Sequence, residues 1–187
     1  MTEKEKKSIS KFLSYILRHN PQQLGLELRD GGWVRVDKLL AAMRSTGSAM
    51  TIDDLKEIVT TNAKQRFAFN EDLSEIRANQ GHSLDVDLAL EARQPPSELY
   101  HGTASIHLHS IRENGILKMN RHHVHLSADR ETARQVGTRH GKAVVLIIEA
   151  EKMWQEGSLF LLSNNGVWLT EVVPARFIKA MPDTDTL

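Results

Sequence analysis

Two consecutive prolines, Pro95 and Pro96, lie at the middle of the 187-residue chain and separate halves that differ in hydrophobic pattern. Proline fixes φ at about −65° and pushes the preceding residue toward extended backbone, so neither a long helix nor a central strand can run through this segment. A chain of this length can bury one medium core or two small ones. We therefore expect two domains, at residues 1–93 and 97–187.

The N-terminal half has a helical pattern first and a strand pattern later. Its first apolar residues recur at helical spacing, and the helix should end before Pro21: Ile9, Phe12, Leu13, Ile16 and Leu17. A second helix is expected after Asp37 as N-cap, and a third from the capping-box pattern at residues 51–54. Residues 66–69 and 74–78 then flank a turn, which is a β-hairpin pattern. Three helices with a late hairpin predict a winged-helix-like unit.

The C-terminal half alternates short strands with two short helices. Strands are expected at residues 98–101, 123–127, 143–149, 159–162 and 166–172, and helices at 105–113 and 129–136. This pattern indicates a mixed unit, so the fold class of the whole chain is predicted to be α+β. Neither a Gly-x-Gly-x-x-Gly turn nor a Walker-type Gly-Lys-Ser/Thr sequence is present. A nucleotide, if bound, must be held by another arrangement.

The composition excludes several chemistries. Without cysteine, the chain has no disulfides, thiolate zinc site, iron–sulfur cluster or cysteine nucleophile. Its 24 Lys and Arg balance 24 Asp and Glu, so the whole molecule offers no field that attracts nucleic acid. The apolar run at residues 143–148 is far shorter than the roughly 20 residues of a membrane span. We expect a cytoplasmic protein with no membrane partner, and a monomer because no long apolar stripe is left unassigned.

One segment departs from this neutrality. Residues 99–142 hold seven Lys and Arg against three acids, together with seven of the nine histidines. Such a segment favours a pocket for a phosphorylated ligand, although solvated helix-face charges beside unrelated histidines would give the same composition. His107-x-His109 and His123-x-His125 also permit a histidine–metal hydrolase. In a helix, however, a two-residue spacing places His107 and His109 on different faces, so this alternative is remote.

Seven separated motifs bear on function: Ser14-Tyr-Ile-Leu-Arg-His19, Arg66-Phe67, Ile76-Arg-Ala-Asn-Gln-Gly-His-Ser83, Tyr100-His-Gly-Thr103, Met119-Asn-Arg-His-His-Val-His-Leu-Ser127, Val136-Gly-Thr-Arg-His-Gly-Lys142 and Asn165-Gly-Val-Trp-Leu-Thr170. In order and spacing, from about residue 8 to 180, they resemble the NAD-dependent RNA 2′-phosphotransferase (tRNA 2′-phosphotransferase) family. The resemblance implies a winged-helix lobe followed by an NAD-binding lobe of the ADP-ribosyltransferase type. It also implies transfer of an internal RNA 2′-phosphate, such as a tRNA splice junction carries, to NAD. The products would be RNA 2′-OH, nicotinamide and ADP-ribose 1″,2″-cyclic phosphate.

The family's catalytic positions map onto Arg18, His19, Arg66 and Arg121. Guanidinium groups suit a phosphate because they give planar, bidentate, charge-assisted hydrogen bonds. Without the resemblance, Arg18 and His19 could equally be cations that stabilise a helix C-terminus, and Arg66 a solvated edge charge. Because the three arginines supply the positive charge, we expect no metal.

The resemblance places NAD binding at six further positions: His101, Gly102, Thr103, His125, Ser127 and Val167. His101 would bond a ribose hydroxyl, and Gly102 would let the dinucleotide approach the backbone. Thr103 and Ser127 are expected near the nicotinamide amide, and Arg139 with His140 beside the NAD phosphates. Val167 stands where better-known members of the fold have glutamate.

The missing glutamate fits an acceptor that is already an anion and needs positioning more than a base. We expect the 2′-phosphate to attack C1″ of NAD, after which the 2″-OH attacks phosphorus and expels the RNA 2′-oxygen. The arginines would neutralise charge in the second step, and His19 would deliver the proton or only bind phosphate. An alternative is ADP-ribosylation of other phosphate ends of nucleic acid, and another is a non-catalytic nucleic-acid adaptor.

Overall fold

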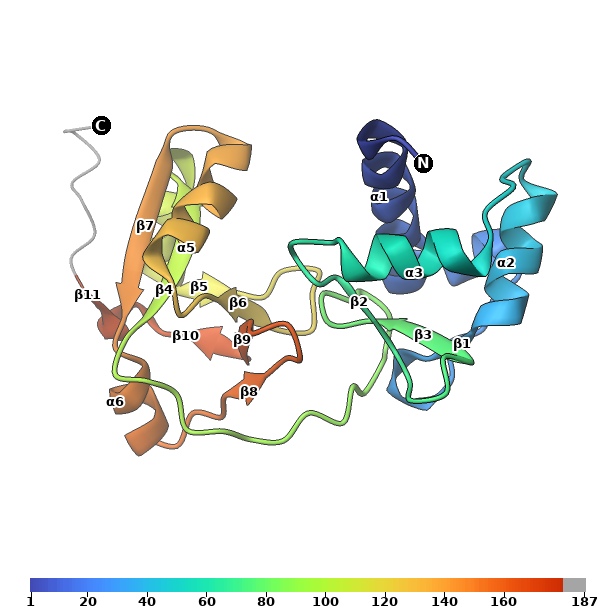
Figure 1. The fold of residues 1–187 in the computed structure, drawn as a ribbon. Coiled ribbons are helices and arrows are strands. Elements are labelled where there is room, and N and C mark those ends of the chain that lie inside the picture. Colours follow the sequence, from blue (N-terminus) through green and yellow to red (C-terminus); the bar gives the residue numbers. More distant parts are fainter. Residues whose placement is uncertain (180–187) are drawn as a thin grey trace. The chain divides into compact units, whose positions relative to one another are not determined.

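The computed structural model describes residues 1–179 and divides the chain into two compact units, Met1–Ala89 and Leu90–Leu187 (Figure 1). Each unit has its own cluster of buried apolar side chains. Residues 180–187 and the side chain of His140 lie outside the described part, so the end of the predicted C-terminal domain does too. The molecule is a mixed α/β structure, as the sequence predicted in outline.

The first unit begins with α1 (Glu3–His19), the long helix that the apolar spacing predicts. Thr2 and Glu5 form a capping box at its start, and the helix ends at His19, with Asn20 as the C-cap directly before Pro21. Proline disfavours helical backbone in the residue before it, which explains the end point. Buried side chains on one stripe of the helix include Leu13, Ile16 and Leu17, which belong to the apolar core of the first unit.

Two further helices and a small sheet complete the first unit: α2 (Val36–Ser45), α3 (Ile52–Thr60), β1 (Val34–Arg35), β2 (Phe67–Phe69) and β3 (Glu75–Ala78). The strands pair antiparallel in the order β1-β3-β2, which confirms the predicted hairpin. Short 3₁₀ turns η1 (Pro21–Leu24) and η2 (Asp30–Gly32) link α1 to β1.

One predicted cap is wrong. Arg35, not Asp37, occupies the N-cap position of α2. The carboxylate of Asp37 is instead held by Arg35, with Nη2 2.7 Å from Oδ2, and this guanidinium is the main reason that the pKa of Asp37 falls to about 2. The capping box predicted for α3 is present, with Thr51 and Asp54 bonding reciprocally.

The second unit is built on a sheet of order β11-β7-β4, with β4 (Leu99–Ala104), β7 (Ala143–Ile148) and β11 (Ile178–Lys179). Strands β4 and β7 pair antiparallel along six residues, from Leu99 opposite Ile148 to Ala104 opposite Ala143. Helix α5 (Arg130–Gly137) packs against these two strands. This sheet carries the Tyr100-His-Gly-Thr103 motif in its strand β4.

A second sheet has the order β6-β9-β8, with β6 (Val124–Leu126), β9 (Trp168–Thr170) and β8 (Leu161–Leu162). A single bridge between Tyr100 and Ser127 joins the edge of β4 to the end of β6. Val124, Leu126 and Trp168 face the core of the unit, together with Leu146, Ile148 and Phe160. Alternate residues of β6 therefore face away from that core.

The remaining elements are short: η3 (Ser105–His107), α4 (Leu108–Asn114), β5 (Ile116–Leu117), η4 (Thr138–His140), α6 (Ala150–Gln155), β10 (Val172–Val173) and η5 (Ala175–Phe177). The predicted strand at 166–172 is two strands, because β9 pairs with β6 whereas β10 pairs with β5. Among the described residues, no helix is both long enough and apolar enough to cross a membrane.

Gly102 in β4 is expected to be essential for the stability of the second unit. A Cβ atom there would overlap the carbonyl oxygen of Ala133 in α5, and a Cβ at Gly137 would lie 2.7 Å from the carbonyl oxygen of Thr103. Gly102→Ala should therefore lower the free energy of unfolding by about 3 kcal/mol, measured by urea denaturation. Gly47→Ala is the control, because its Cβ meets nothing within 4 Å and only the φ of +85° opposes it, at about 1 kcal/mol. Equal losses for both variants would contradict the packing argument.

Candidate functional site

Arg18 and His19 lie in the last turn of α1 and are held by the segment that follows β3. The Nδ1 atom of His19 is 2.9 Å from Oγ of Ser83, and the Ser83 amide donates to the Arg18 carbonyl at 3.1 Å. A Cβ at Gly81 would be 3.7 Å from Cζ of Arg18, so the guanidinium rests against a glycine. Arg18 is half-buried and His19 is exposed. The segment thus anchors the helix end, and the His19 side chain is exposed to solvent.

Arg66, directly before β2, is more than a solvated edge charge. Its Nη1 atom donates to Oδ1 of Asn62 at 3.3 Å and lies 3.5 Å from Oγ of Ser10. Asn62 donates to the same Ser10 hydroxyl at 2.8 Å, and the Arg66 carbonyl accepts from the amide of Asn79. Ser10 belongs to α1 and is 5% exposed. Long-range hydrogen bonds therefore hold the half-buried Arg66 side chain against α1.

Arg18 lies on the same side of α1 as Ser10, the residue that Arg66 contacts. Ser10, Ser14 and Arg18 are spaced four residues apart, which places them on one helix face. Helical side chains tilt toward the helix N-terminus, so the Arg18 side chain extends back along this face, where Arg66 contacts Ser10. Arg66 thus contacts α1 at Ser10, whereas Arg18 and His19 lie about two helical turns farther along, where the Arg18 guanidinium rests against Gly81.

In the second unit, Arg121, His125 and His101 form a connected group. The Nη1 atom of Arg121 is 3.3 Å from Nδ1 of His125, and Nδ1 of His101 is 3.1 Å from the His125 carbonyl oxygen. A guanidinium only donates, so Nδ1 of His125 accepts and its ring proton is on Nε2. A carbonyl only accepts, so Nδ1 of His101 carries a proton. Both tautomers follow from the identities of the partners.

The electrostatic setting of His101 keeps its ring neutral. Burial lowers its pKa, the hydrogen bond to His125 opposes that shift, and the positive charge of Arg121 lowers the pKa further. A neutral ring protonated on Nδ1 has its lone pair on Nε2. His101 can therefore accept a hydrogen bond from a ligand hydroxyl at neutral pH.

Three of the predicted cofactor residues, His125, Ser127 and Val167, lie along the face of the β6-β9-β8 sheet that is turned away from the core. We call this face, which also includes Leu169 and Leu161, the His125 face. His125 is opposite Leu169 in the ladder, and Leu169 is opposite Leu161. Extending the same register by two residues places Ser127 opposite Val167. Val167 is fixed by Ser163, whose Oγ accepts from the Val167 amide at 3.1 Å and donates to its carbonyl at 2.9 Å. The His125 face thus carries hydroxyl, imidazole and aliphatic groups but no carboxylate at position 167.

Gly102 and Thr103 have structural surroundings that the sequence did not reveal. The structure supplies a packing reason for Gly102, since it faces the backbone of α5. Thr103 is 7% exposed and is two residues beyond His101, hence on the same face of β4. Ser127 bonds Tyr100 through its amide and carbonyl, and its Oγ accepts from the amide of Asp129 at 3.1 Å.

The other sequence candidates are dispersed. Arg139 lies in the exposed turn η4, and the His140 side chain is outside the described part. Nε2 of His109 is 3.4 Å from Oε1 of Glu113, and both side chains are exposed on α4. Within residues 1–179, no three His, Asp or Glu side chains are grouped so that they could hold a metal ion. The paired histidines of the hydrolase hypothesis are thus not gathered into such a group there.

Sequence reasoning missed the supporting residues Ser10 and Asn62, and it placed Ser83 in a family motif without assigning it a contact. The spacing of Ser10, Ser14 and Arg18 is visible in the sequence, whereas the contacts of Asn62 with Ser10 and of Ser83 with His19 join residues 52 and 64 positions apart. Only the tertiary structure reveals those pairs.

Comparison with known proteins gives a consistent result. Residues 4–172 match the model of the family described as RNA 2′-phosphotransferase, Tpt1 / KptA family. A Burkholderia pseudomallei protein named "Probable RNA 2′-phosphotransferase" is 51% identical over 170 residues, which cover 91% of this chain and 92% of that protein. Proteins of the same name from Trichormus variabilis and Flavobacterium johnsoniae are 50% and 45% identical, over 97% and 96% of this chain and 100% and 98% of their own lengths.

Proposed function

The chain belongs to the RNA 2′-phosphotransferase, Tpt1/KptA family, and on that premise we propose that it transfers an internal 2′-phosphate of RNA to NAD. The products would be RNA 2′-OH, nicotinamide and ADP-ribose 1″,2″-cyclic phosphate. The observation that carries the proposal is the group formed by Arg121, His125 and His101. It combines a cation for a phosphate with a neutral imidazole that can accept from a ribose hydroxyl.

The second unit supplies the groups that we assign to NAD. His101 would accept from a ribose hydroxyl through Nε2, and Ser127 and Thr103 would offer hydroxyls to the nicotinamide amide. His125 orients His101 through its carbonyl and Arg121 through its ring. Gly102 would act indirectly, by letting α5 close on β4 and so fixing the strand that presents His101.

The first step needs positioning and little else. A nonbridging oxygen of the RNA 2′-phosphate attacks C1″ of NAD, the glycosidic bond to nicotinamide breaks, and nicotinamide leaves with that electron pair. The acceptor is an anion, so no general base is required, which fits Val167 in a position without a carboxylate. The product of this step is an ADP-ribosylated RNA 2′-phosphodiester.

The second step needs charge stabilisation and a proton. The 2″-OH attacks phosphorus and gives up its proton, the bond between phosphorus and the RNA 2′-oxygen breaks, and that oxygen takes up a proton, so the step has no net gain or loss of protons. Arg18, Arg66 and Arg121 would neutralise the nonbridging oxygens, where one such contact is typically worth about 3 to 4 kcal/mol. His19, exposed at the end of α1, would deliver the proton to the leaving oxygen.

The test is release of nicotinamide from NAD in the presence of an oligoribonucleotide with one internal 2′-phosphate. We expect stoichiometric release and conversion of the RNA to its 2′-OH form, and no release with the same RNA lacking that phosphate. Nicotinamide release that occurs only with terminal phosphates would instead identify an ADP-ribosyltransferase of phosphate ends. NAD left intact under both conditions would contradict both activities.

Ser83→Ala is expected to slow the second step about tenfold, because Ser83 is a positioning residue that holds Nδ1 of His19. In single-turnover kinetics the ADP-ribosylated intermediate should build up. In steady-state kinetics the KM for NAD should stay unchanged. Ser110→Ala, at an exposed serine of α4, is the control and should match wild type. An equal slowing of both steps would indicate a general structural role for Ser83 instead.

A further inference from the structure

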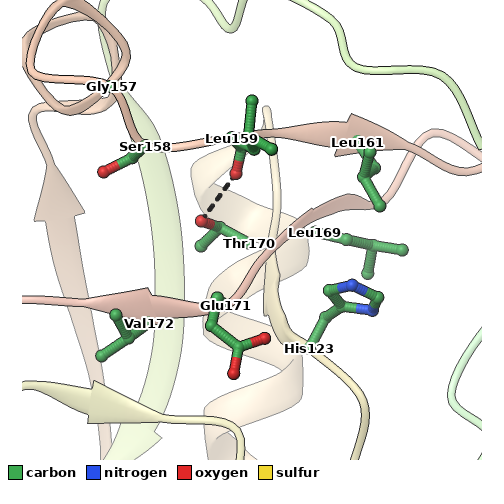
Figure 2. Close-up of a pocket in the computed structure, with 9 residues that line it drawn as sticks. All are labelled: His123, Gly157, Ser158, Leu159, Leu161, Leu169, Thr170, Glu171 and Val172. Carbon is green, nitrogen blue, oxygen red and sulfur yellow. Dashed lines mark hydrogen bonds between the residues drawn. The ribbon is translucent and has the colours of Figure 1, made fainter.

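The His125 face extends into a pocket of about 420 Å³ that the proposed reaction does not use (Figure 2). Leu159, Leu161 and Leu169 supply apolar lining, and His123 and Glu171 supply polar lining. Leu159 is 65% exposed, although leucine is a residue that proteins usually bury. The volume is within the roughly 300–1,000 Å³ of small-ligand sites, so the pocket has room for a planar organic group.

The strand register explains why these five side chains meet. Leu161 and His125 are both opposite Leu169, and alternate residues along a strand share a face. Leu159 is two residues before Leu161, His123 is two residues before His125, and Glu171 is two residues after Leu169. Figure 2 shows these three around the same space as Leu161 and Leu169, with a hydrogen bond from Thr170 to the Leu159 carbonyl, at 2.9 Å, tying the β8 side to β9. The pocket is therefore a continuous extension of the His125 face.

The order of the strands across the sheet places the pocket on the side of His125 that is opposite to His101, the residue assigned to NAD. The bridge from Tyr100 to Ser127 makes β4 the neighbour of β6, and β9 and β8 follow. His101 is on β4 and His125 is on β6, whereas the leucines are on or beside β8 and β9. His123 directly precedes β6 and is two residues, or about 7 Å in extended backbone, from His125. A group in the pocket would thus be next along the sheet from His125, whose ring contacts Arg121, and on the side away from His101.

The chemistry of the lining selects an uncharged, flat ligand with N–H groups. Burial lowers the pKa of His123, and His122 and Lys118 lower it further; Glu171 opposes the shift but does not reverse it, so the ring offers a neutral aromatic surface. Glu171 pairs with Lys118 and keeps a carboxylate that only accepts hydrogen bonds. A carboxylate and three leucines disfavour phosphate. RNA bases, by contrast, stack on side chains such as histidine and donate from their edges to acceptors.

We propose that this pocket holds an unpaired nucleobase of the RNA strand that carries the 2′-phosphate, stacked on His123 with an N–H directed at Glu171. The proposal rests on the proposed function and assigns it a substrate-recognition site. A base there would hold the RNA in register while its 2′-phosphate is at Arg121. The enzyme would then prefer single-stranded or flexible RNA around the phosphate, because a paired base cannot enter the pocket.

The test uses the full chain and oligoribonucleotides with one internal 2′-phosphate. Three further oligonucleotides lack the base at the phosphorylated nucleotide, at its 5′ neighbour or at its 3′ neighbour. The variants are His123→Ala and Leu159→Ala. Their matched controls are His109→Ala and Ile106→Ala, whose side chains are exposed elsewhere in the same unit. The KM for RNA, the KM for NAD and kcat are measured for each combination.

We expect His123→Ala to raise the KM for the complete RNA about tenfold, in the range for loss of one stacking contact, and Leu159→Ala to raise it less. One abasic oligonucleotide should show the same rise with wild type, and His123→Ala should add nothing on that substrate. The controls, kcat and the KM for NAD should not change.

Several outcomes would overturn the proposal. The first is an unchanged KM for RNA in both pocket variants. The second is an equal rise in the KM of His123→Ala for every RNA, including all three abasic ones. The third is a rise in the KM for NAD while the KM for RNA is unchanged. The last result would assign the pocket to the dinucleotide. A wild-type protein that releases no nicotinamide with any 2′-phosphorylated RNA would instead refute the proposed function, so the two failures are distinguishable.

Discussion

Arg121→Lys is expected to lower kcat about 100- to 1,000-fold, the loss typical of removing one donor to a charged transition state. Lysine keeps the positive charge but not the planar fork that binds two oxygens of a phosphate. It also cannot donate to Nδ1 of His125 in the geometry that Nη1 of Arg121 has, at 3.3 Å. The measurement is steady-state kinetics with 2′-phosphorylated RNA and NAD.

The control for Arg121 is Arg130→Lys, a conservative change at an exposed position at the start of α5. It should leave kcat unchanged. A kcat for Arg121→Lys within about threefold of wild type would mean that charge alone is needed at this position, and the bidentate role would be abandoned.

His19→Ala should stop the reaction after its first step. The 2′-phosphate can attack NAD without a proton donor, whereas the RNA 2′-oxygen leaves poorly unless it is protonated. Loss of a general acid typically costs about 10²- to 10⁴-fold. We therefore expect the ADP-ribosylated RNA to accumulate, detected by acid quench and mass spectrometry, while nicotinamide is still released.

A matched control for His19 is His109→Ala, which removes an exposed histidine of α4. It should complete both steps at the wild-type rate. If His19→Ala releases nicotinamide slowly and never accumulates the intermediate, His19 acts in phosphate binding or in the first step, and its role as the second-step acid is wrong.

The elements that could be predicted from the sequence are those whose signals are local. Helix α1 has its apolar spacing and its stop before Pro21, and the hairpin β2–β3 has turn residues between two strand patterns. Helix α3 has a capping box that is visible in four letters. In each case the local preference and the tertiary structure agree, which is the condition under which sequence patterns are reliable.

The elements that were missed depend on distant partners. Helix α6 is six residues long and β5 two residues, too short for a periodic signal, and the two-residue β10 was merged with β9 into one predicted strand. Strand β10 exists because Val172 and Val173 pair with Leu117 and Ile116 across more than fifty positions. Local patterns carry no information about such pairing.

The candidate site was predictable as a set of residue types but not as a set of contacts. Arg66 alone indicates only an edge charge, and its contacts with Ser10 and Asn62 are tertiary. The role of Gly102 beside a dinucleotide stays a prediction, and the structure adds a packing reason for this glycine, because the backbone of α5 lies where its Cβ would be. The tautomers of His101 and His125 follow from partners that only the fold brings together.

The most direct test of the central claim is to run the reaction in ¹⁸O-labelled water with NAD and 2′-phosphorylated RNA. The account predicts that the phosphate moves to ADP-ribose without contact with water. Nicotinamide and the cyclic phosphate should then form in equal amounts, and neither the cyclic phosphate nor the RNA 2′-OH should contain ¹⁸O. Inorganic phosphate that carries one ¹⁸O atom, with NAD left intact, would show hydrolysis and contradict phosphate transfer to NAD.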